Sequence, residues 1–289
     1  RSYYACIGLL LLSLVWKMLS SEANDSKIWT TASFLDFVEG ELVDGGANSY
    51  VAPDGSVRLI NLYDLNQDGN VDAVFPSTHD NSEAIDLYIY WGKTGLGPSR
   101  RTTLPTAGAK DVAIADLNQD SYPDLVVANR FDGTRTDLNS YIYWGSPQGL
   151  GARNRMELPT QGAESVAVGD LNKDGFPEIV FANSGLSYHV AEDSFNQSFV
   201  YWGSSKGYSA DRRLNLKTIN GRDVKIADLN RDGASDLVFA NEGNSAKDGG
   251  ITIYWGTLQG EFSAERFEHL PGEFSSGLDV ADFNGDGHL

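Results

Sequence analysis

The stretch of sequence that decides the fold runs from Asp64 to Asp72 and reads D-L-N-Q-D-G-N-V-D. Its first, third, fifth and ninth positions carry side-chain oxygens, and Gly69 at the sixth position permits a sharp bend. A tight loop with this spacing can turn its odd positions toward one centre, where the backbone carbonyl of Asn70 at position seven adds another oxygen. We therefore expect a short acidic loop whose oxygens converge on one point.

Two markers recur along the chain. D-L-N-x-D begins at Asp64, Asp116, Asp170 and Asp228, and D-F-N-G-D begins at Asp282, so the starts are 52, 54, 58 and 54 residues apart. The second marker, Y-W-G, begins at Tyr90, Tyr143, Tyr201 and Tyr254, at intervals of 53, 58 and 53 residues. Two markers that keep the same phase indicate one structural unit that is repeated.

Short apolar runs flank each acidic loop. In the second unit V-A-I-A (112–115) precedes the loop and L-V-V-A (125–128) follows it, while Y-I-Y-W (141–144) and R-M-E-L (155–158) predict a third and a fourth strand. No stretch shows a convincing helical period. Four short strands per repeat predict an all-β fold, a β-propeller of four-stranded blades, with four complete units and the start of a fifth.

The acidic loops are predicted calcium sites. Hard oxygen ligands, several of them charged, favour Ca²⁺ over zinc or copper, and without a cation the carboxylates would repel one another. The alternative is that Asp, Asn and Gly only mark exposed turns, but five occurrences in register between strands weigh against it. The predicted ligands, with position seven contributing its carbonyl, are Asp64, Asn66, Asp68, Asn70 and Asp72; Asp116, Asn118, Asp120, Tyr122 and Asp124; Asp170, Asn172, Asp174, Phe176 and Glu178; Asp228, Asn230, Asp232, Ala234 and Asp236; and Asp282, Asn284, Asp286 and His288.

Two of the loops depart from the shared pattern. The second has Ser121 where glycine would stand, and the third has Glu178, whose longer side chain must fit the same space. An EF-hand is excluded because the twelfth position is Phe or Val instead of a bidentate acid, and because strands flank the loops.

Composition limits the class of protein. The 289 residues include 40 Asp and Glu against 22 Lys and Arg, a net charge of −18, and the five loops hold 14 of those acids. The chain offers no basic face for phosphates, so we exclude a nucleic-acid partner. A single cysteine excludes an intrachain disulfide framework.

The N-terminal region is predicted to be a targeting segment. Residues 5–16 form an uncharged run that is shorter than the roughly 18 apolar residues of a membrane span, and the small residues Ser20, Ser21 and Ala23 follow it. A buried core helix is the alternative. We divide the chain into a signal peptide (1–23), a segment that donates outer strands (24–55) and propeller repeats (56–289) that stop within a unit.

The repeats resemble FG-GAP repeats of the VCBS type, which build the integrin α-subunit propeller and occur in many bacterial secreted proteins. The resemblance covers about residues 56–289 and rests on the five loops and on the approaches P-T-A-G-A (105–109) and P-T-Q-G-A (159–163). It implies structural Ca²⁺ between two strands of a blade and seven blades in a complete ring. Y-W-G is not part of the family pattern. We interpret its aromatic residues as packing between blades, with sugar stacking by Trp91, Trp144, Trp202 and Trp255 as the alternative.

Motifs for catalysis are weak. G-S-S-K-G at 203–207 matches the nucleophile pattern G-x-S-x-G, but the sister turns at 145–149 and 256–260 read G-S-P-Q-G and G-T-L-Q-G, so we expect a hairpin turn. The histidines share no spacing and form no H-E-x-x-H motif. No catalytic residue is predicted.

The sequence predicts a secreted calcium-binding propeller that acts as a binding or adhesion module outside the cell, at its surface or in the periplasm. Its partner would be an extracellular protein or a glycan, with no membrane span after signal cleavage. The loops at 76–86, 129–139, 183–197 and 241–249 vary between units, which indicates either recognition or tolerated surface variation. The alternative function is an accessory propeller of a secreted hydrolase, or a carbohydrate-binding lectin, whose active region lies beyond residue 289.

Overall fold

The computed structural model describes residues 41–42, 49–51, 57–59, 61–76, 86–92, 101–185, 196–243, 248–263, 266–281 and 288–289. The predicted signal peptide lies outside these residues. The strands form four antiparallel sheets of four strands each, joined in chain order. These sheets, which we call blades 1 to 4, consist of β4 (Asn61–Tyr63), β5 (Asp72–Phe75), β6 (Leu87–Tyr90) and β7 (Arg101–Leu104); β8 (Ala109–Ala115), β9 (Asp124–Asn129), β10 (Asn139–Tyr143) and β11 (Arg155–Pro159); β12 (Ala163–Gly169), β13 (Glu178–Asn183), β14 (Asn196–Tyr201) and β15 (Arg213–Thr218); and β16 (Gly221–Ala227), β17 (Asp236–Asn241), β18 (Gly249–Tyr254) and β19 (Phe267–Gly272).

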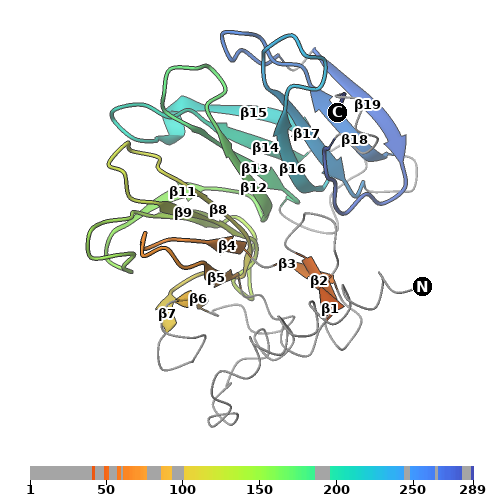
Figure 1. Ribbon diagram of the computed structural model, residues 1–289. Coiled ribbons are helices and arrows are strands. Elements are labelled where there is room, and N and C mark those ends of the chain that lie inside the picture. Colours follow the sequence, from red (N-terminus) through yellow and green to blue (C-terminus); the bar gives the residue numbers. More distant parts are fainter. Residues whose placement is uncertain are drawn as a thin grey trace, which may run out of the picture.

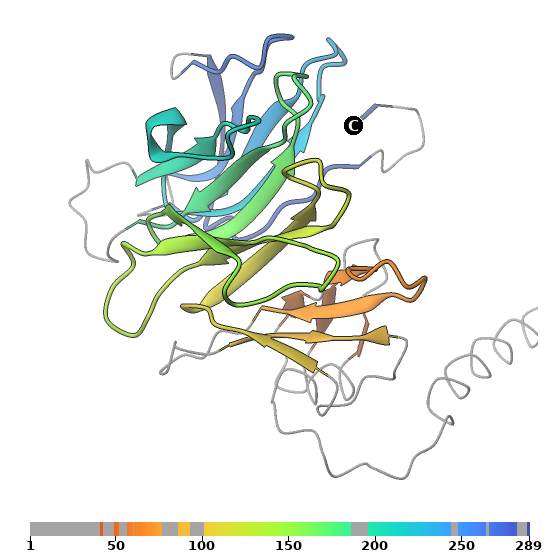
Figure 2. The same ribbon diagram turned by 90° about the vertical axis from the view of Figure 1, so that its left-hand side faces the viewer.

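The blades follow one another in chain order around an arc (Figures 1 and 2). The first strand of blade 3, β12, lies between the first strands of blades 2 and 4, β8 and β16. In every blade the acidic loop joins the first strand to the second, as predicted. A 3-10 turn, η3 (Ala210–Arg212), precedes β15.

The second strand of each blade is buried at every position, in β5, β9, β13 and β17 alike. In blades 2 and 3 neighbouring blades cover both faces of this strand, and a strand covered on both faces has no polar side. This burial explains why the runs at 125–128 and at the equivalent positions of the other blades are continuously apolar.

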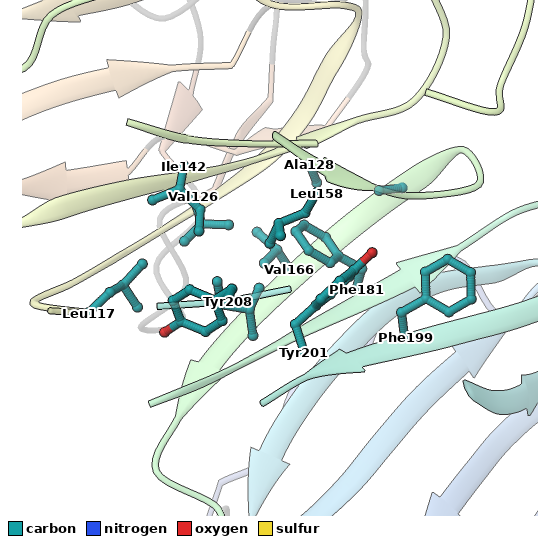
Figure 3. Close-up of a cluster of buried hydrophobic side chains, with 12 residues drawn as sticks. Leu117, Val126, Ala128, Ile142, Leu158, Val166, Phe181, Phe199, Tyr201 and Tyr208 are labelled. Carbon is teal, nitrogen blue, oxygen red and sulfur yellow. The ribbon is translucent and has the colours of Figure 1, made fainter. Parts of the chain in front are cut away.

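The hydrophobic cores lie between the blades. One cluster (Figure 3) joins Leu117, Val126 and Ile142 of blade 2 to Val166 and Phe181 of blade 3, all at most 6% exposed. Two similar clusters join blades 1 and 2 and blades 3 and 4. Since each fully buried apolar side chain of this size contributes about 1.5–3 kcal/mol, the inter-blade cores are a main source of stability.

The tyrosines of the Y-W-G marker tie blades 2, 3 and 4 each to the blade that precedes it. All four are almost completely buried. Tyr254 donates its hydroxyl to the carbonyl of Lys217 at 2.8 Å, and Tyr143 and Tyr201 donate to the carbonyls of Pro105 and Pro159 in the same way. These contacts confirm that the aromatic residues pack between blades.

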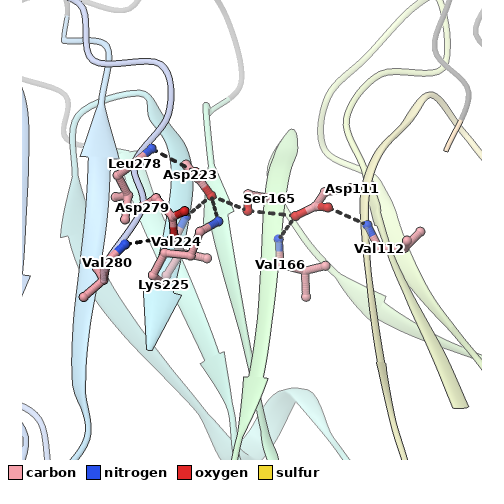
Figure 4. A network of polar contacts seen from close by, with 10 residues as sticks. All are labelled: Asp111, Val112, Ser165, Val166, Asp223, Val224, Lys225, Leu278, Asp279 and Val280. Carbon is pink, nitrogen blue, oxygen red and sulfur yellow. Dashed lines mark hydrogen bonds and ion pairs between the residues drawn. The ribbon is translucent and has the colours of Figure 1, made fainter. Parts of the chain in front are cut away.

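A polar network crosses the first strands near their starts (Figure 4). The carboxylate of Asp111 accepts hydrogen bonds from the backbone N–H of Val112 and of Val166, at 2.8 and 3.0 Å. The hydroxyl of Ser165 lies 2.9 Å from carboxylate oxygens of both Asp111 and Asp223. Because this hydroxyl has one proton, it can donate to only one of the two carboxylates at a time. Burial raises the pKa of Asp111.

The segment before blade 1 has a sheet of its own in the described residues. β1 (Glu41–Leu42), β2 (Ser49–Val51) and β3 (Val57–Leu59) pair antiparallel in the order β1-β2-β3. None of the described pairs joins this sheet to a blade. The role of residues 24–55 as donors of outer strands stays a prediction.

Candidate metal centres

Each of the four described acidic loops closes on its first carboxylate. Asp64 accepts hydrogen bonds from the backbone N–H of Asp68, at position five, and of Gly69, at position six, with lengths of 3.0 and 2.9 Å. The amide oxygen of Asn66 at position three accepts from the same N–H of Asp68, at 3.0 Å. The other loops repeat this pattern at Asp116, Asp170 and Asp228.

The same backbone turn produces each closure. Positions four and six both lie in the left-handed region, with φ of 56° at Gln67 and 85° at Gly69. Ser121 occupies position six of the second loop at φ 71°, and its N–H still donates to Asp116 at 2.8 Å. Glycine is therefore not required at position six, although a residue with a Cβ is strained there.

The ninth residue ties the loop to the end of the third strand. Asp124 accepts hydrogen bonds from the N–H of Leu117, at position two, and of Gly145, the glycine of Y-W-G, with lengths of 2.8 and 2.7 Å. The remaining loops repeat both bonds at Asp72, Glu178 and Asp236. Glu178 thus fits in place of Asp, although its bond to the N–H of Gly203 is longer, at 3.2 Å.

The ninth carboxyl lies in apolar surroundings close to the other loop acids. Burial is the main cause that raises the pKa of Asp124 to about 6 and that of Glu178 to about 7. The carboxylates at positions one and five of the same loop raise the pKa further, as they also do for Asp72 and Asp236. The three acids of a loop are therefore within electrostatic reach of one another.

The glycine of Y-W-G is required by close approach. A Cβ on Gly145 would lie 2.4 Å from the backbone oxygen of Pro123, at position eight of the loop. The same clash would arise at the three sister glycines, with distances of 2.1 to 2.4 Å. The two sequence markers keep the same phase because they meet in space at this contact.

The types of donor atom in each loop fit Ca²⁺. Positions one, three, five and seven offer two carboxylates, an amide oxygen and a carbonyl, all hard oxygen donors. Within the described part of the chain, no three His, Cys, Asp or Glu side chains are grouped so that they could hold a metal ion by themselves. The ninth carboxylate accepts hydrogen bonds from two backbone N–H groups and so ties the loop to the strand, and its role as a further ligand stays a prediction. Of the fifth loop, Asp282, Asn284 and Asp286 lie outside the described residues, and His288 lies within them.

Position four makes contacts that the sequence reasoning missed. Gln67, Gln119 and Lys173 each donate a side-chain hydrogen bond to a backbone carbonyl in the acidic loop of the next blade, at 2.6 Å in all three cases. The signal that could have revealed them is a long polar donor at the fourth position of all four loops, where Arg231 is the last.

The other candidate sites differ in outcome. The turn at 203–207 is a hairpin, because the N–H of Gly207 donates to the carbonyl of Ser204 at 2.8 Å and Ser204 donates its hydroxyl back to Gly207. Trp202 lines a cavity of about 460 Å³ between blades 3 and 4. The other residues around that cavity are Leu214, Thr257, Glu261, Phe262, Ser263 and Arg266. The variable loops at 77–85, 186–195 and 244–247 lie outside the described residues.

Four-stranded antiparallel blades, each with an acidic loop between its first two strands, define a β-propeller repeat protein. The family model of the FG-GAP-like repeat matches residues 64–127, 116–181 and 228–289, and that of the FG-GAP repeat matches residues 162–201. The chain belongs to the FG-GAP repeat family.

Individual proteins share part of this chain. Integrin alpha-7 from Homo sapiens is 34% identical over 116 residues, which is 37% of this chain and 9% of the integrin. Phosphatidylinositol-glycan-specific phospholipase D from Rattus norvegicus is 30% identical over 156 residues, which is 45% of this chain and 18% of the lipase. The crystal structure of BBS1N in complex with ARL6DN superposes with a TM-score of 0.42 at 13% identity, covering 73% of this chain and 53% of that one. The chain matches less than a fifth of the length of either curated relative.

Among the described residues, no helix has the length and apolar character needed to cross a membrane.

Proposed function

We propose that this chain is an extracellular binding module whose blades are stabilised by structural Ca²⁺ in the acidic loops. The observation that carries the proposal is the recurrence of one loop geometry in four blades, with three mutually repelling acids and one amide oxygen in each. Polar turns that arose independently would not repeat such a set of donors at the same place in every blade.

The residues of each loop have separate roles in this proposal. The acids at positions one and five, the asparagine at three and the carbonyl at seven would hold the ion. The ninth acid, which is also a predicted ligand, fixes the loop against the third strand. A bound Ca²⁺ supplies positive charge that cancels the repulsion between the loop acids. At a free Ca²⁺ concentration of about ten times the Kd, one bound ion adds about 1.4 kcal/mol to the free energy of unfolding. A large effect on stability therefore requires several occupied sites.

Recognition is proposed for the ends of the blades that carry the loops between second and third strands. A rigid scaffold that presents variable loops is a common arrangement for ligand binding. The predicted signal peptide and the similarity to an integrin α-chain support a location outside the cell and a protein partner. The similarity to a phospholipase D supports the alternative, an accessory propeller of a larger secreted enzyme.

A glycan partner is the second candidate, and the cavity at Trp202 favours it. Trp91 donates its indole N–H to the hydroxyl of Thr102, at 3.0 Å, whereas the equivalent position in blade 3 is Leu214. Leu214 cannot accept a hydrogen bond from the indole N–H of Trp202, and Trp202 and Glu261 both line the cavity, as an aromatic ring and a carboxylate that a sugar could contact. Glycan-array binding that is lost in Glu261→Ala but kept in Gln259→Ala would support this candidate. An array without any hit would count against it.

The calcium proposal is tested by thermal unfolding of the purified protein. Removal of calcium by EGTA should lower the Tm by several degrees, and Ca²⁺ should restore it where equal Mg²⁺ does so much less. The variant Asp170→Asn, which removes a first-position acid, should shrink the calcium-dependent shift. Asp211→Asn, an exposed acid outside the loops, should leave the shift unchanged. A Tm that is the same in EGTA and in Ca²⁺ contradicts the proposal.

A further inference from the structure

We infer that the side chain at position four of each acidic loop couples this loop to the loop of the next blade, so that calcium binding by successive loops is positively cooperative. The inference rests on the proposed calcium function and concerns residues that are not themselves ligands.

The coupling contact is the same in three pairs of blades. The amide groups of Gln67 and Gln119 donate to the carbonyls of Ser121 and Gly175, and the ammonium group of Lys173 donates to the carbonyl of Gly233, each at 2.6 Å. The donor is always position four of one loop, and the acceptor is always position six of the next. Glutamine and lysine differ in length and charge, yet both reach the carbonyl of position six in the next loop. The arrangement of the blades therefore sets this contact.

The accepting peptide group is held at both ends. The carbonyl of Gly175 accepts from Gln119, and the N–H of the same peptide unit, which belongs to Phe176, donates to the carboxylate of Asp174 at 2.8 Å. Because a peptide unit is planar and rigid, the orientation of this carbonyl depends on the position of the Asp174 carboxylate. Asp174 is the fifth-position acid of the third loop, and the carbonyl ligand of Phe176 follows directly.

The position-four donor is flanked by two predicted ligands of its own loop. Gln119 stands between Asn118 and Asp120, two predicted ligands of the second loop, and has φ 63°. Gln67, Lys173 and Arg231 have φ between 56° and 60°. An ion that orders ligands three and five of one loop therefore also orders the residue whose side chain reaches the next loop.

Cooperativity follows from shared ordering. When a first ion fixes one loop, the hydrogen bond from position four restricts the peptide unit of the next loop, which then loses less conformational entropy when it binds its own ion. The coupling is reciprocal, so the second ion also strengthens binding of the first. An exposed hydrogen bond of this kind supports a coupling of about three- to fivefold in affinity per pair of loops. Gly285, at position four of the fifth loop, has no side chain to continue the series.

The first test is a calcium titration of the purified protein by calorimetry. The double variant Gln119→Leu with Lys173→Met removes two donors and keeps the side-chain sizes. Its matched control is Gln148→Leu with Lys206→Met, which removes the same groups from exposed positions of hairpin turns. The wild-type protein and the control should bind with a Hill coefficient above one. The double variant should bind with a clearly lower coefficient, because only the contact from Gln67 to Ser121 remains, and with a midpoint about threefold higher.

The second test is amide hydrogen exchange, which follows one loop at a time. Asp116→Asn removes a predicted ligand from the second loop. Added calcium should then protect the N–H of Phe176, in the third loop, less than in the wild-type protein. In a Gln119→Leu background, Asp116→Asn should change that protection no further.

Three outcomes are decisive. Reduced cooperativity in the double variant alone supports the inference. Equal Hill coefficients in all three proteins, with calcium bound, overturn the inference and leave the calcium function intact. Absence of calcium binding by the wild-type protein overturns both.

Discussion

The backbone N–H of Gly145 donates a hydrogen bond of 2.7 Å to the carboxylate of Asp124, and this contact joins the end of the third strand to the end of the acidic loop. The two residues are 21 positions apart. The contact is possible because Gly145 has no Cβ to meet the carbonyl of Pro123. It makes the acidic loop a part of the blade, instead of an appendage to it.

Substitution of this glycine tests the contact directly. Gly145→Ala places a Cβ 2.4 Å from a backbone oxygen, so the blade must shift and the hydrogen bond to Asp124 must lengthen. We expect a loss of about 2–3 kcal/mol in the free energy of unfolding, measured by urea denaturation. The control Gly151→Ala meets no atom within 4 Å and should change the free energy by less than about 0.5 kcal/mol. Equal effects of the two variants would show that the contact is unimportant.

Ser121 is a site where the protein can be stabilised. Its φ of 71° is unfavourable for a residue with a Cβ by about 1–2 kcal/mol, and only part of this cost is offset by the greater flexibility of glycine in the unfolded chain. Ser121→Gly should therefore raise the free energy of unfolding by about 0.5–1 kcal/mol. The reverse change at the same loop position, Gly69→Ser, has open space around the Cβ and should lower it by a similar amount. Destabilisation by Ser121→Gly would contradict this account.

An ion-pair ladder is expected to hold three blades together. Glu164 of blade 3 pairs with Arg130 of blade 2, at 2.5 Å, and with Arg222 of blade 4, and the Glu164 side chain is 7% exposed. Glu164→Gln removes the negative charge that two partly buried guanidinium groups face. It should lower the free energy of unfolding by about 3 kcal/mol. Glu157→Gln, which breaks an exposed pair with Arg155, should cost about 0.5 kcal/mol or less. Similar losses for both would mean that the ladder does not stabilise the packing of blades.

The pH dependence of stability should have opposite signs at two aspartates. Burial raises the pKa of Asp111, so the folded state binds a proton there more tightly than the unfolded state does. Its contribution to stability is present at low pH and is lost as pH rises from 3.8 through the raised pKa. Hydrogen bonds, first that from the Thr134 hydroxyl, lower the pKa of Asp132, so its contribution is lost as pH falls through the lowered pKa.

Urea denaturation between pH 3 and pH 7 would separate these two effects. In Asp111→Asn, stability should decline less with rising pH than in the wild-type protein. In Asp132→Asn, stability should decline less with falling pH. If the free energy of unfolding of both variants changed with pH as it does in the wild-type protein, these roles of Asp111 and Asp132 would be contradicted.

Much of this architecture can be predicted from the sequence, because repetition amplifies weak local signals. One apolar run such as 125–128 fits a strand or a buried helix, but four copies on fixed sides of an acidic loop fit only a blade. The positions that hold oxygen donors could be predicted for the same reason. The hydrogen bonds from Gln119 and Lys173 could not, since they join loops 56 and 60 residues apart, and only the three-dimensional packing of blades brings these loops together. The hydrogen bond between Gly145 and Asp124 could not be predicted for the same reason, although the constant phase of the two markers is consistent with it.

The number of calcium ions bound per chain is the most direct measure of whether these loops are metal centres. Equilibrium dialysis of the purified protein against radioactive Ca²⁺ at millimolar concentration gives that number, and Asp116→Asn, Asp170→Asn and Asp228→Asn each remove one loop from the count. We predict at least one ion for each of the four described loops and the loss of about one ion with each substitution. A protein that retains less than one ion per chain, or the same number in all of these variants, would contradict the account.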